Sequence, residues 1–301
     1  MSSTHRAVVA TSAGVIGVDD VDTPEVGPGE VAVRVGVSGV NPVDAHVIAG
    51  AFGPDVFPYI AGCEFTGEIV SVGSEIGSRS PGDRVAAQPK PFMGDPGAWQ
   101  DIVVLPVDRV AAVPDDLTDE VAGTVVLPAL TALTLARAGA LGAGQAAVVP
   151  GAAGGVGRWL TQLLLADGVA VTTVTSGDDV EEMAAWGAVA VDRDDATAVA
   201  GLKDFDALFD VAGGGEEAVA QRWGWLADDG RYLSVSSQGD DIEFMMVQWD
   251  ADGLEHLLQG VADGTFKVPT AKLYPPKQVQ AAIDDFTSRR VARTALDFRQ
   301  V

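Results

Sequence analysis

The sequence predicts an α/β protein in which a doubly wound parallel sheet is joined to a domain of antiparallel strands. Three observations carry this prediction. A glycine-rich turn, GAAGGVG at 151–157, lies between a short apolar run and a helical pattern. Further short apolar runs follow it at intervals that suit alternating strands and helices. The first third of the chain instead holds valine-rich runs broken by Gly, Pro and Ser, which are typical of antiparallel sheets.

The composition sets limits on partners and location. The chain has 301 residues, 47% of them hydrophobic, and a formal net charge of −24, so we expect two domains and no nucleic-acid partner. The longest uncharged run, around Val121 to Leu135, is interrupted by Gly, Thr and Pro and falls short of the ~20 residues of a membrane span. The first residues lack the apolar core of a secretory signal. We expect a cytoplasmic protein that binds no membrane.

The acidic residues come in pairs that are spread along the chain. We expect these pairs to lie on solvated faces and loops, and their density is typical of proteins from a salt-rich, halophilic cytoplasm. The single cysteine, Cys63, excludes an intrachain disulfide. The acidic pairs are Asp19-Asp20, Asp115-Asp116, Asp194-Asp195 and Asp240-Asp241.

The first third is predicted to form an antiparallel barrel or small sheet. Its strands are expected at Glu30–Val40, Glu64–Gly73 and Asp83–Pro89, which are valine-rich runs broken by Gly, Pro and Ser. Helix-start chemistry at Leu117-Thr118-Asp119-Glu120 places the domain boundary near Pro114.

The middle of the chain begins with a βαβ unit. Ala146 to Val149 reads as a buried strand, apolar residues from Val156 recur at helical spacing as far as Asp167-Gly168, and Val169 to Val174 reads as a second strand.

The glycine turn inside this unit predicts a dinucleotide site. Gly151 permits a tight reversal, Gly154 lets the backbone approach a pyrophosphate, and Gly157 lets the helix lie against the strand. The free N–H groups at the start of the helix would then face the phosphates. A turn with a purely structural role is the alternative. The cofactor-binding positions predicted here are Gly151, Ala153, Gly154, Gly155, Val156 and Gly157.

Three more strands extend the pattern, at Ala188–Asp192, Phe205–Gly214 and Gly230–Ser237. Gly and Ser at strand ends leave room for a ligand across the carboxyl edge of the sheet, where open α/β sheets bind. We therefore add Ala212, Gly213 and Ser234 to the predicted cofactor site. After about His256, one helix and one strand leave the α/β pattern and are expected to return to the first domain.

These motifs together resemble the zinc-independent quinone oxidoreductases, the zeta-crystallin-like family of the medium-chain dehydrogenase/reductase superfamily. The resemblance implies a GroES-like β-barrel catalytic domain at 1–114 and 257–301, a Rossmann domain at 115–256, NAD(P)H held in the cleft between them, and a homodimer. It runs in order along the chain through SGVNPVDAHVIAG, FPYIAGCEFTGEIVSVG, GDRV, LPALTAL, PGAAGGVG and FDALFDVAGG.

The resemblance also bears on a metal. The zinc ligands of related alcohol dehydrogenases correspond here to Asn41, Cys63 and Leu127, of which Leu127 has no donor atom and Asn41 is a poor zinc ligand. We expect no zinc. An ion held by His46, Cys63 and Glu64 is the alternative, weighed against a buried thiol, a Glu–backbone contact and a partly exposed histidine.

Without a metal, hydride transfer needs an oriented nicotinamide and donors that stabilise negative charge on the acceptor oxygen. The resemblance points to Asn41 and Tyr59 as those donors, and to Thr131 beside the nicotinamide. Each residue also has a purely structural alternative. Asn41 could bond to the local backbone of the turn before Pro42, Tyr59 could pack on the core or the cofactor, and Thr131 could bond to its own helical turn. His46 aligns with a proton-relay histidine of zinc enzymes, and we expect no such role for it.

The nucleotide is predicted to be NADPH, with NADH as the alternative. Thr175-Ser176 stands where an acidic residue would bind the ribose hydroxyl of NAD. Arg193 resembles the arginine that contacts the 2′-phosphate in NADPH-using relatives. Asp178-Asp179 stands against this prediction, because it would repel a phosphate, although salt would weaken the repulsion.

The sequence thus predicts an NADPH-dependent reductase of a small apolar quinone or enone. The loop Lys90–Gln100, with Phe92, Met93 and Trp99, is expected to border the acceptor site. The physiological acceptor and the proton donor do not follow from the sequence.

Two other functions compete with this prediction. An enoyl thioester reductase would need basic residues to bind the phosphate of coenzyme A or of a carrier. The residues that come nearest to forming a basic cluster are Arg289, Arg290 and Arg293. A redox sensor or interaction protein would bind the nucleotide with little turnover.

Overall fold

The computed structural model describes residues 4–90, 93–288 and 293–300, which form two compact units. The first unit joins Met1–Leu127 to Trp249–Val301, and the second is Pro128–Gln248. The units divide inside helix α2 (Asp119–Gly139) rather than at the expected position near Pro114. The reason is packing: Gly123 lies against the backbone of Val37 in the first unit, and Gly139 lies against the Phe209 ring in the second.

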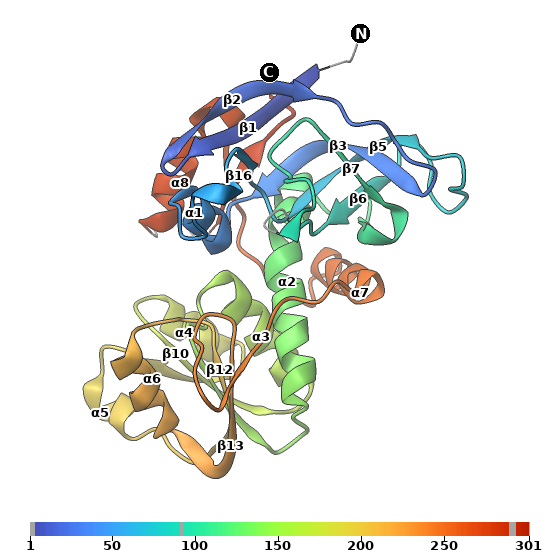
Figure 1. The fold of residues 1–301 in the computed structure, drawn as a ribbon. Coiled ribbons are helices and arrows are strands. Elements are labelled where there is room, and N and C mark those ends of the chain that lie inside the picture. The colour runs from blue at the N-terminus through green and yellow to red at the C-terminus, as the bar shows by residue number, and fades with distance from the viewer. Residues whose placement is uncertain (1–3, 91–92, 289–292, 301) are drawn as a thin grey trace. The chain divides into compact units, whose positions relative to one another are not determined.

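The first unit contains two sheets, a three-stranded one with the order β2-β1-β4 and a seven-stranded one with the order β15-β16-β3-β5-β6-β8, in which β7 also pairs with β3 (Figure 1). The expected valine-rich strands are confirmed as β3, β5 and β6. The strand bounds are β1 (Thr4–Ser12), β2 (Val15–Asp22), β3 (Glu30–Gly39), β4 (Tyr59–Ile60), β5 (Phe65–Val72), β6 (Arg84–Ala87), β7 (Ile102–Pro106), β8 (Val110–Ala112), β15 (Lys272–Tyr274) and β16 (Thr294–Asp297).

Strand β3 lies at the centre of the large sheet. It pairs with β5, β7 and β16, and its four valines, Val31, Val33, Val35 and Val37, are all buried. These valines alternate along the strand with Ala32, Arg34 and Gly36, of which Arg34 alone is exposed. The pairing of β16 with β3 brings the C-terminal segment back to the first unit, as expected. The helices of this unit, besides the start of α2, are α1 (Pro42–Ile48), α7 (Ala251–Ala262) and α8 (Val279–Thr287).

The second unit is a six-stranded parallel sheet with the order β11-β10-β9-β12-β13-β14 and with helices on both faces (Figure 1). The predicted doubly wound sheet is confirmed. The order reverses between β9 and β12, and open α/β sheets bind ligands at such a reversal. The bounds are β9 (Ala146–Pro150), α3 (Gly155–Ala166), β10 (Ala170–Thr175), α4 (Asp179–Ala185), β11 (Val189–Asp192), α5 (Ala196–Ala200), β12 (Phe205–Asp210), α6 (Glu216–Trp223), β13 (Leu226–Ser234) and β14 (Ile242–Phe244).

Helix α2 corrects one expectation about apolar length. It continues through Pro128 for 21 residues, and in the described part of the chain it is the one helix long and apolar enough to span a membrane. Of its most apolar window, 67% is buried within the structure. Gly, Thr and Pro were expected to interrupt this apolar segment, but a helix that packs inside a fold tolerates them. Burial in the core accounts for the hydropathy of this helix.

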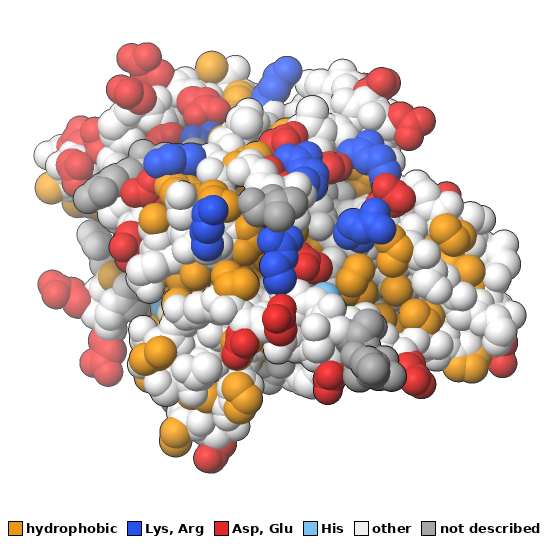
Figure 2. All heavy atoms as spheres, turned by 90° about the horizontal axis from the view of Figure 1, so that it is seen from above, with side chains coloured by type: hydrophobic (Ala, Val, Ile, Leu, Met, Phe, Trp, Pro, Cys, Tyr) orange, Lys and Arg blue, Asp and Glu red, His pale blue; other side chains and the backbone are white. Residues whose placement is uncertain are grey.

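The acidic pairs lie where they were expected. All eight side chains of the pairs at 19–20, 115–116, 194–195 and 240–241 are exposed. Figure 2 shows acidic side chains spread over one face of the molecule, with Lys and Arg side chains between them.

Candidate functional site

The glycine turn connects β9 to α3 at the reversal of the strand order. Gly151 has a φ of +84°, a conformation that side chains other than glycine rarely adopt. A Cβ at Gly151 would lie 2.9 Å from the Cα atom of Ala212, so glycine also lets this turn touch the loop that follows β12. The two loops at the carboxyl edge therefore pack directly against each other.

The other two glycines differ in what requires them. A Cβ at Gly157 would overlap the carbonyl oxygen of Gly151, so the packing of α3 on the turn requires glycine there. A Cβ at Gly154 would meet one described atom, the Gly151 carbonyl oxygen, at 3.2 Å, and the Gly154 φ of −70° suits any residue. The fold itself barely needs a glycine at 154. The space beside it, in front of the first N–H groups of α3, fits the close approach of a phosphate.

The residues predicted to select the nucleotide lie on adjacent strands. Thr175 ends β10 opposite Asp192, the last residue of β11, and the Arg193 N–H donates to the Thr175 carbonyl oxygen at 2.6 Å. Thr175 is buried and Ser176 half-buried, whereas the Arg193 side chain is 55% exposed. The structure thus brings Thr175, Ser176 and Arg193 together at the carboxyl edge.

Arg158, which the sequence reasoning missed, fastens the glycine turn to α4. Its buried guanidinium is 2.6 Å from the carboxylate of Asp179 and 2.6 Å from that of Glu182, and its Nε donates to the Ala153 carbonyl oxygen at 2.9 Å. Asp179 was expected to repel a phosphate, but this pairing offsets its charge. The spacing of three residues between Asp179 and Glu182 was the available signal, because it puts both on one face of a helix.

The loop after β12 is held by Asp210, whose carboxylate is fully buried. It pairs with Arg222 at 2.9 Å and accepts a hydrogen bond from the Tyr232 hydroxyl at 2.9 Å. The N–H groups of Ala212 and Gly213 donate to the same carboxylate at 3.1 and 3.2 Å. These two N–H groups therefore shape the loop, and a cofactor would meet other atoms of Ala212 and Gly213.

Ser234 has a structural hydroxyl. It is fully buried, donates to the Asp210 carbonyl oxygen at 3.1 Å, and accepts from the N–H groups of Ser236 and Ser237. The turn after β13 thus occupies this hydroxyl, and the place of Ser234 in the cofactor site stays a prediction. Any contact from this residue would use its backbone.

In the first unit, Asn41 lies just before α1 and is 2% exposed. Pro42 begins the helix, and the Asp44 carboxylate accepts the Asn41 N–H at 2.9 Å, which fixes the backbone at this position. The Asn41 Nδ2 donates to Glu64 Oε1 at 2.7 Å, and Asn41 Oδ1 accepts from Arg293 Nη1 at 3.4 Å. The Asn41 side chain is thus held by a long-range network.

Glu64 is the centre of this network. Its fully buried carboxylate pairs with Arg293 at 2.6 Å and accepts the backbone N–H of Leu127 at 2.9 Å. The expected Glu–backbone contact is confirmed. Arg293 is itself buried, so it does not belong to an exposed basic cluster, while Arg289 and Arg290 lie outside the described residues.

Tyr59 lies in β4 with a buried ring that is 6% exposed. Its hydroxyl has no hydrogen-bond partner among the described residues. Burial raises the pKa of Tyr59, and the nearby Cys63 and Asp44 raise it further, so the hydroxyl keeps its proton and is a donor. A buried donor of this kind is normally satisfied, so this hydroxyl points to a ligand.

Asp44 and Cys63 are buried next to each other. Burial raises the pKa of Asp44 to about 7, although N–H donation from Gly62 and Asn41 lowers it. Burial also raises the pKa of the Cys63 thiol, with Asp44 the next cause. Both groups therefore favour their protonated forms.

The remaining expected positions differ in how exposed their side chains are. Thr131 is buried on α2 in the second unit, His46 is exposed, and Met93 is exposed. Trp99 is fully buried, and its Nε1 donates to the Gly39 carbonyl oxygen at 3.3 Å, so this ring belongs to the core and not to an acceptor site. Phe92 lies outside the described residues.

Comparison with known proteins decides the family. The model of the alcohol dehydrogenase GroES-like domain matches residues 27–115. An L-threonine 3-dehydrogenase from Anaeromyxobacter is 30% identical over an alignment of 240 positions, which covers 67% of this chain and 68% of that protein. The chain belongs to the medium-chain dehydrogenase/reductase superfamily.

Quinone oxidoreductases are among its relatives. One from Pseudomonas aeruginosa is 33% identical over 166 residues, which cover 55% of this chain and 50% of that protein. The solved structure of a quinone oxidoreductase from Coxiella burnetii has a TM-score of 0.87 at 20% identity, over 98% of this chain and 99% of that one. The chain spans about half the length of the first curated relatives it matches. The GroES-like domain with a Rossmann-like parallel sheet is confirmed as the fold.

The superfamily contains zinc enzymes, so the donor set matters. Among the described residues, no group of three His, Cys, Asp or Glu side chains is placed to hold a metal. Leu127 has no donor atom in its side chain, and the Asn41 amide is bound by Glu64 and Arg293. Of the three positions that the resemblance assigns to zinc ligands, only Cys63 has a side chain suited to zinc, whereas a catalytic zinc needs three protein ligands.

Proposed function

We propose that the protein is an NADPH-dependent reductase of quinones or α,β-unsaturated carbonyls that works without zinc. The observation that carries the proposal is the Tyr59 hydroxyl, a buried donor with no partner among the described residues, in the same unit as the buried Asn41 amide. Membership in a superfamily of NAD(P)H-using oxidoreductases, with quinone oxidoreductases among its relatives, supports it.

The glycine turn fits a dinucleotide. Gly151 and Gly157 are needed for packing, whereas Gly154 leaves space in front of the α3 N-terminus, where backbone N–H groups and the helix dipole favour a pyrophosphate. We assign the nucleotide to this turn. Arg193, Thr175 and Ser176 would receive a 2′-phosphate, and Arg158 supports this preference by offsetting the charges of Asp179 and Glu182.

The nucleotide, when bound, supplies a hydride that reduces the acceptor, and solvent or a side chain supplies the balancing proton. The protein's part is to stabilise the negative charge that grows on the acceptor oxygen. An asparagine amide carries two N–H hydrogens, and the Asn41 amide donates one of them to Glu64. We assign the second to the acceptor oxygen, together with the Tyr59 hydroxyl.

The same chain carries a candidate surface for a homodimer. Strand β14 lies at one edge of the parallel sheet. Its last residue, Phe244, is 42% exposed, and Met246, which follows the strand, is 44% exposed. An exposed apolar strand edge favours pairing with a second copy. Light scattering of the wild type should give a dimer, and Phe244→Asp should shift it to a monomer. A monomeric wild type would contradict this part of the proposal.

Oxidation of NADPH and, separately, NADH by a panel of a benzoquinone, a naphthoquinone, cyclohexenone and crotonyl-CoA tests the function. We expect turnover with a quinone or the enone and a preference for NADPH. Turnover confined to crotonyl-CoA would indicate an enoyl thioester reductase. Nucleotide binding without turnover of any acceptor would indicate a binding or sensing role, and either result would contradict the proposal.

A further inference from the structure

A proline interrupts the hydrogen bonding of α2 beside the Asn41 network. In a regular helix the N–H of residue 128 would donate to the carbonyl oxygen of Thr124, four residues earlier, but Pro128 has no N–H. The Thr124 carbonyl oxygen instead accepts from Arg293 Nη2 at 2.5 Å. The arginine thus takes the place of the helical donor that the proline removes.

Glu64 contacts the backbone of α2 one residue before the proline. The backbone N–H of Leu127, the residue before the proline, donates to Glu64 Oε2 at 2.9 Å. Arg293 and Glu64 are paired at 2.6 Å and nearly inaccessible to solvent, with side chains 7% and 0% exposed. One ion pair therefore supplies a donor and an acceptor to adjacent turns of α2, and the backbone of α2 in turn fixes the ion pair.

This ion pair also orients the Asn41 amide. The Nδ2 group faces the Glu64 carboxylate at 2.7 Å, and the Oδ1 atom faces the Arg293 guanidinium at 3.4 and 3.5 Å. A flipped amide would place its oxygen against a carboxylate and its nitrogen against a cation, which is unfavourable in a buried site. The pair therefore selects one of the two amide orientations.

We propose that Arg293 and Pro128 are positioning residues for Asn41. Arg293 is anchored on the carbonyl oxygen that Pro128 leaves without a helical donor, it holds the Glu64 carboxylate, and Glu64 aims the second N–H of Asn41 away from the network. This inference rests on the proposed function for the role of Asn41 as a donor. The geometry of the network itself is testable without turnover.

The sequence offers an unusually direct probe, because Asn41 is its only asparagine. Protein labelled with ¹⁵N-asparagine gives a single pair of side-chain N–H resonances. Arg293→Lys keeps the charge but loses the planar fork that reaches both the carboxylate and the Thr124 carbonyl. Pro128→Ala restores an N–H that competes for this carbonyl and leaves every charge in place, so it covers the case in which the lysine variant does not fold.

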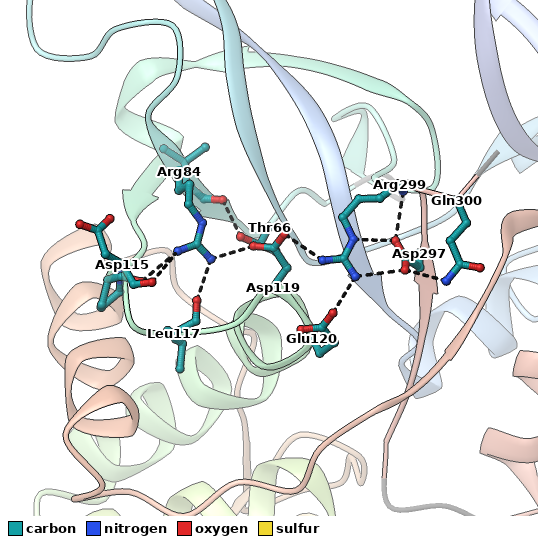
Figure 3. A network of polar contacts seen from close by, with 11 residues as sticks. Thr66, Arg84, Asp115, Leu117, Asp119, Glu120, Asp297, Arg299 and Gln300 are labelled. Carbon is teal, nitrogen blue, oxygen red and sulfur yellow. Dashed lines mark hydrogen bonds and ion pairs between the residues drawn. The ribbon is translucent and has the colours of Figure 1, made fainter.

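Arg84→Lys is the matched control. Arg84 is an arginine of the same unit that also fastens the beginning of α2, through the Asp119 carboxylate and the carbonyl oxygens of Pro114 and Leu117 (Figure 3). None of its hydrogen bonds recorded for the described residues goes to Asn41, Glu64 or Arg293.

We expect the Asn41 amide resonances to shift in Arg293→Lys and in Pro128→Ala and to stay in place in Arg84→Lys. The first two variants should lose roughly tenfold to a hundredfold in kcat with the acceptor, at an unchanged KM for NADPH. Unchanged resonances in folded Arg293→Lys and Pro128→Ala would overturn the proposal. If the wild type reduces no acceptor, the proposed function fails, while the resonances still decide the positioning.

Discussion

The glycine turn of the second unit and the Asn41 network of the first unit are built from different parts of the chain: the turn from backbone, the network from side chains. The turn consists of seven consecutive residues, 151–157, and offers backbone N–H groups at the start of α3. The Asn41 network joins side chains from positions 41, 64 and 293, with buried charges at its centre. Ligand binding by a backbone turn depends on glycines that leave space for the ligand. The stability of a buried side-chain network depends on each buried charge keeping its partner of opposite charge. The two should therefore fail differently.

The largest difference is expected in stability when the buried charge pair is broken. Arg293→Met leaves the Glu64 carboxylate buried without its partner, which should lower the free energy of unfolding by about 3–5 kcal/mol. Arg6→Met breaks the Arg6–Asp101 pair of the same unit, whose side chains are 37% and 23% exposed, and should cost about 1 kcal/mol. Urea unfolding measures both. Equal losses would mean that burial of the Arg293–Glu64 pair does not matter.

A second test of this region uses pH. The Asp44 carboxyl has an ordinary pKa of 3.8 and a pKa of about 7 when buried, so the folded protein holds a proton there that the unfolded chain loses. The stability that Asp44 contributes is present at low pH and is lost as the pH rises towards 7. Between pH 5 and pH 8 the loss should be about 3 kcal/mol relative to Asp44→Asn. Parallel pH dependence of the two proteins in urea unfolding would show that Asp44 does not titrate in this range.

A substitution at Gly154 in the glycine turn should weaken nucleotide binding without lowering the stability of the protein. Gly154→Asp places a negative side chain where the fold leaves space and where we expect the pyrophosphate, so NADPH affinity should fall roughly 100-fold, about 2.7 kcal/mol. The melting temperature should stay near that of the wild type. Gly157→Ala is the counterpart, because its Cβ overlaps the Gly151 carbonyl oxygen and should lower the melting temperature instead. Unchanged NADPH affinity in Gly154→Asp would remove the nucleotide from this turn.

The smallest expected effect concerns the choice of nucleotide. Arg193→Ala removes an exposed guanidinium beside Thr175, so NADPH should bind about tenfold more weakly while NADH is almost unaffected. Binding titrations with both nucleotides measure this difference. Equal weakening of NADPH and NADH would place Arg193 away from the 2′-phosphate.

The same contrast explains what the sequence was able to predict. The glycine turn, the strands on either side of it and the valine-rich strands of the first unit follow from local patterns, and the structure confirms them. Chain separation hid the Asn41 network, since Arg293 lies far along the chain from Glu64 and no spacing rule links them. Arg293 in a run of basic residues looked like a surface charge, yet it is buried as the partner of a buried carboxylate.

Two further side chains have partners that the sequence does not show. Ser234 stands at a strand end that suits a ligand, but its hydroxyl serves the neighbouring turn. Trp99 follows a Gly/Pro-rich loop, but it packs in the core. The sequence predicts the helix or strand on which a residue lies. The partners of its side chain depend on the tertiary structure. Arg158 shows this again, because the acids that it binds belong to the next helix.

The most direct measurement of the central claim follows the single asparagine during binding. Protein labelled with ¹⁵N-asparagine, saturated with NADP⁺, is titrated with cyclohexanone, the ketone that reduction of cyclohexenone yields. We predict that one Asn41 side-chain N–H resonance shifts in a saturable way. The shift should be absent in Gly154→Asp at an NADP⁺ concentration that saturates the wild type but not this variant, whose affinity for the nucleotide should be roughly 100-fold weaker. A resonance that stays unmoved in a protein that turns over cyclohexenone would show that the acceptor oxygen is bound elsewhere.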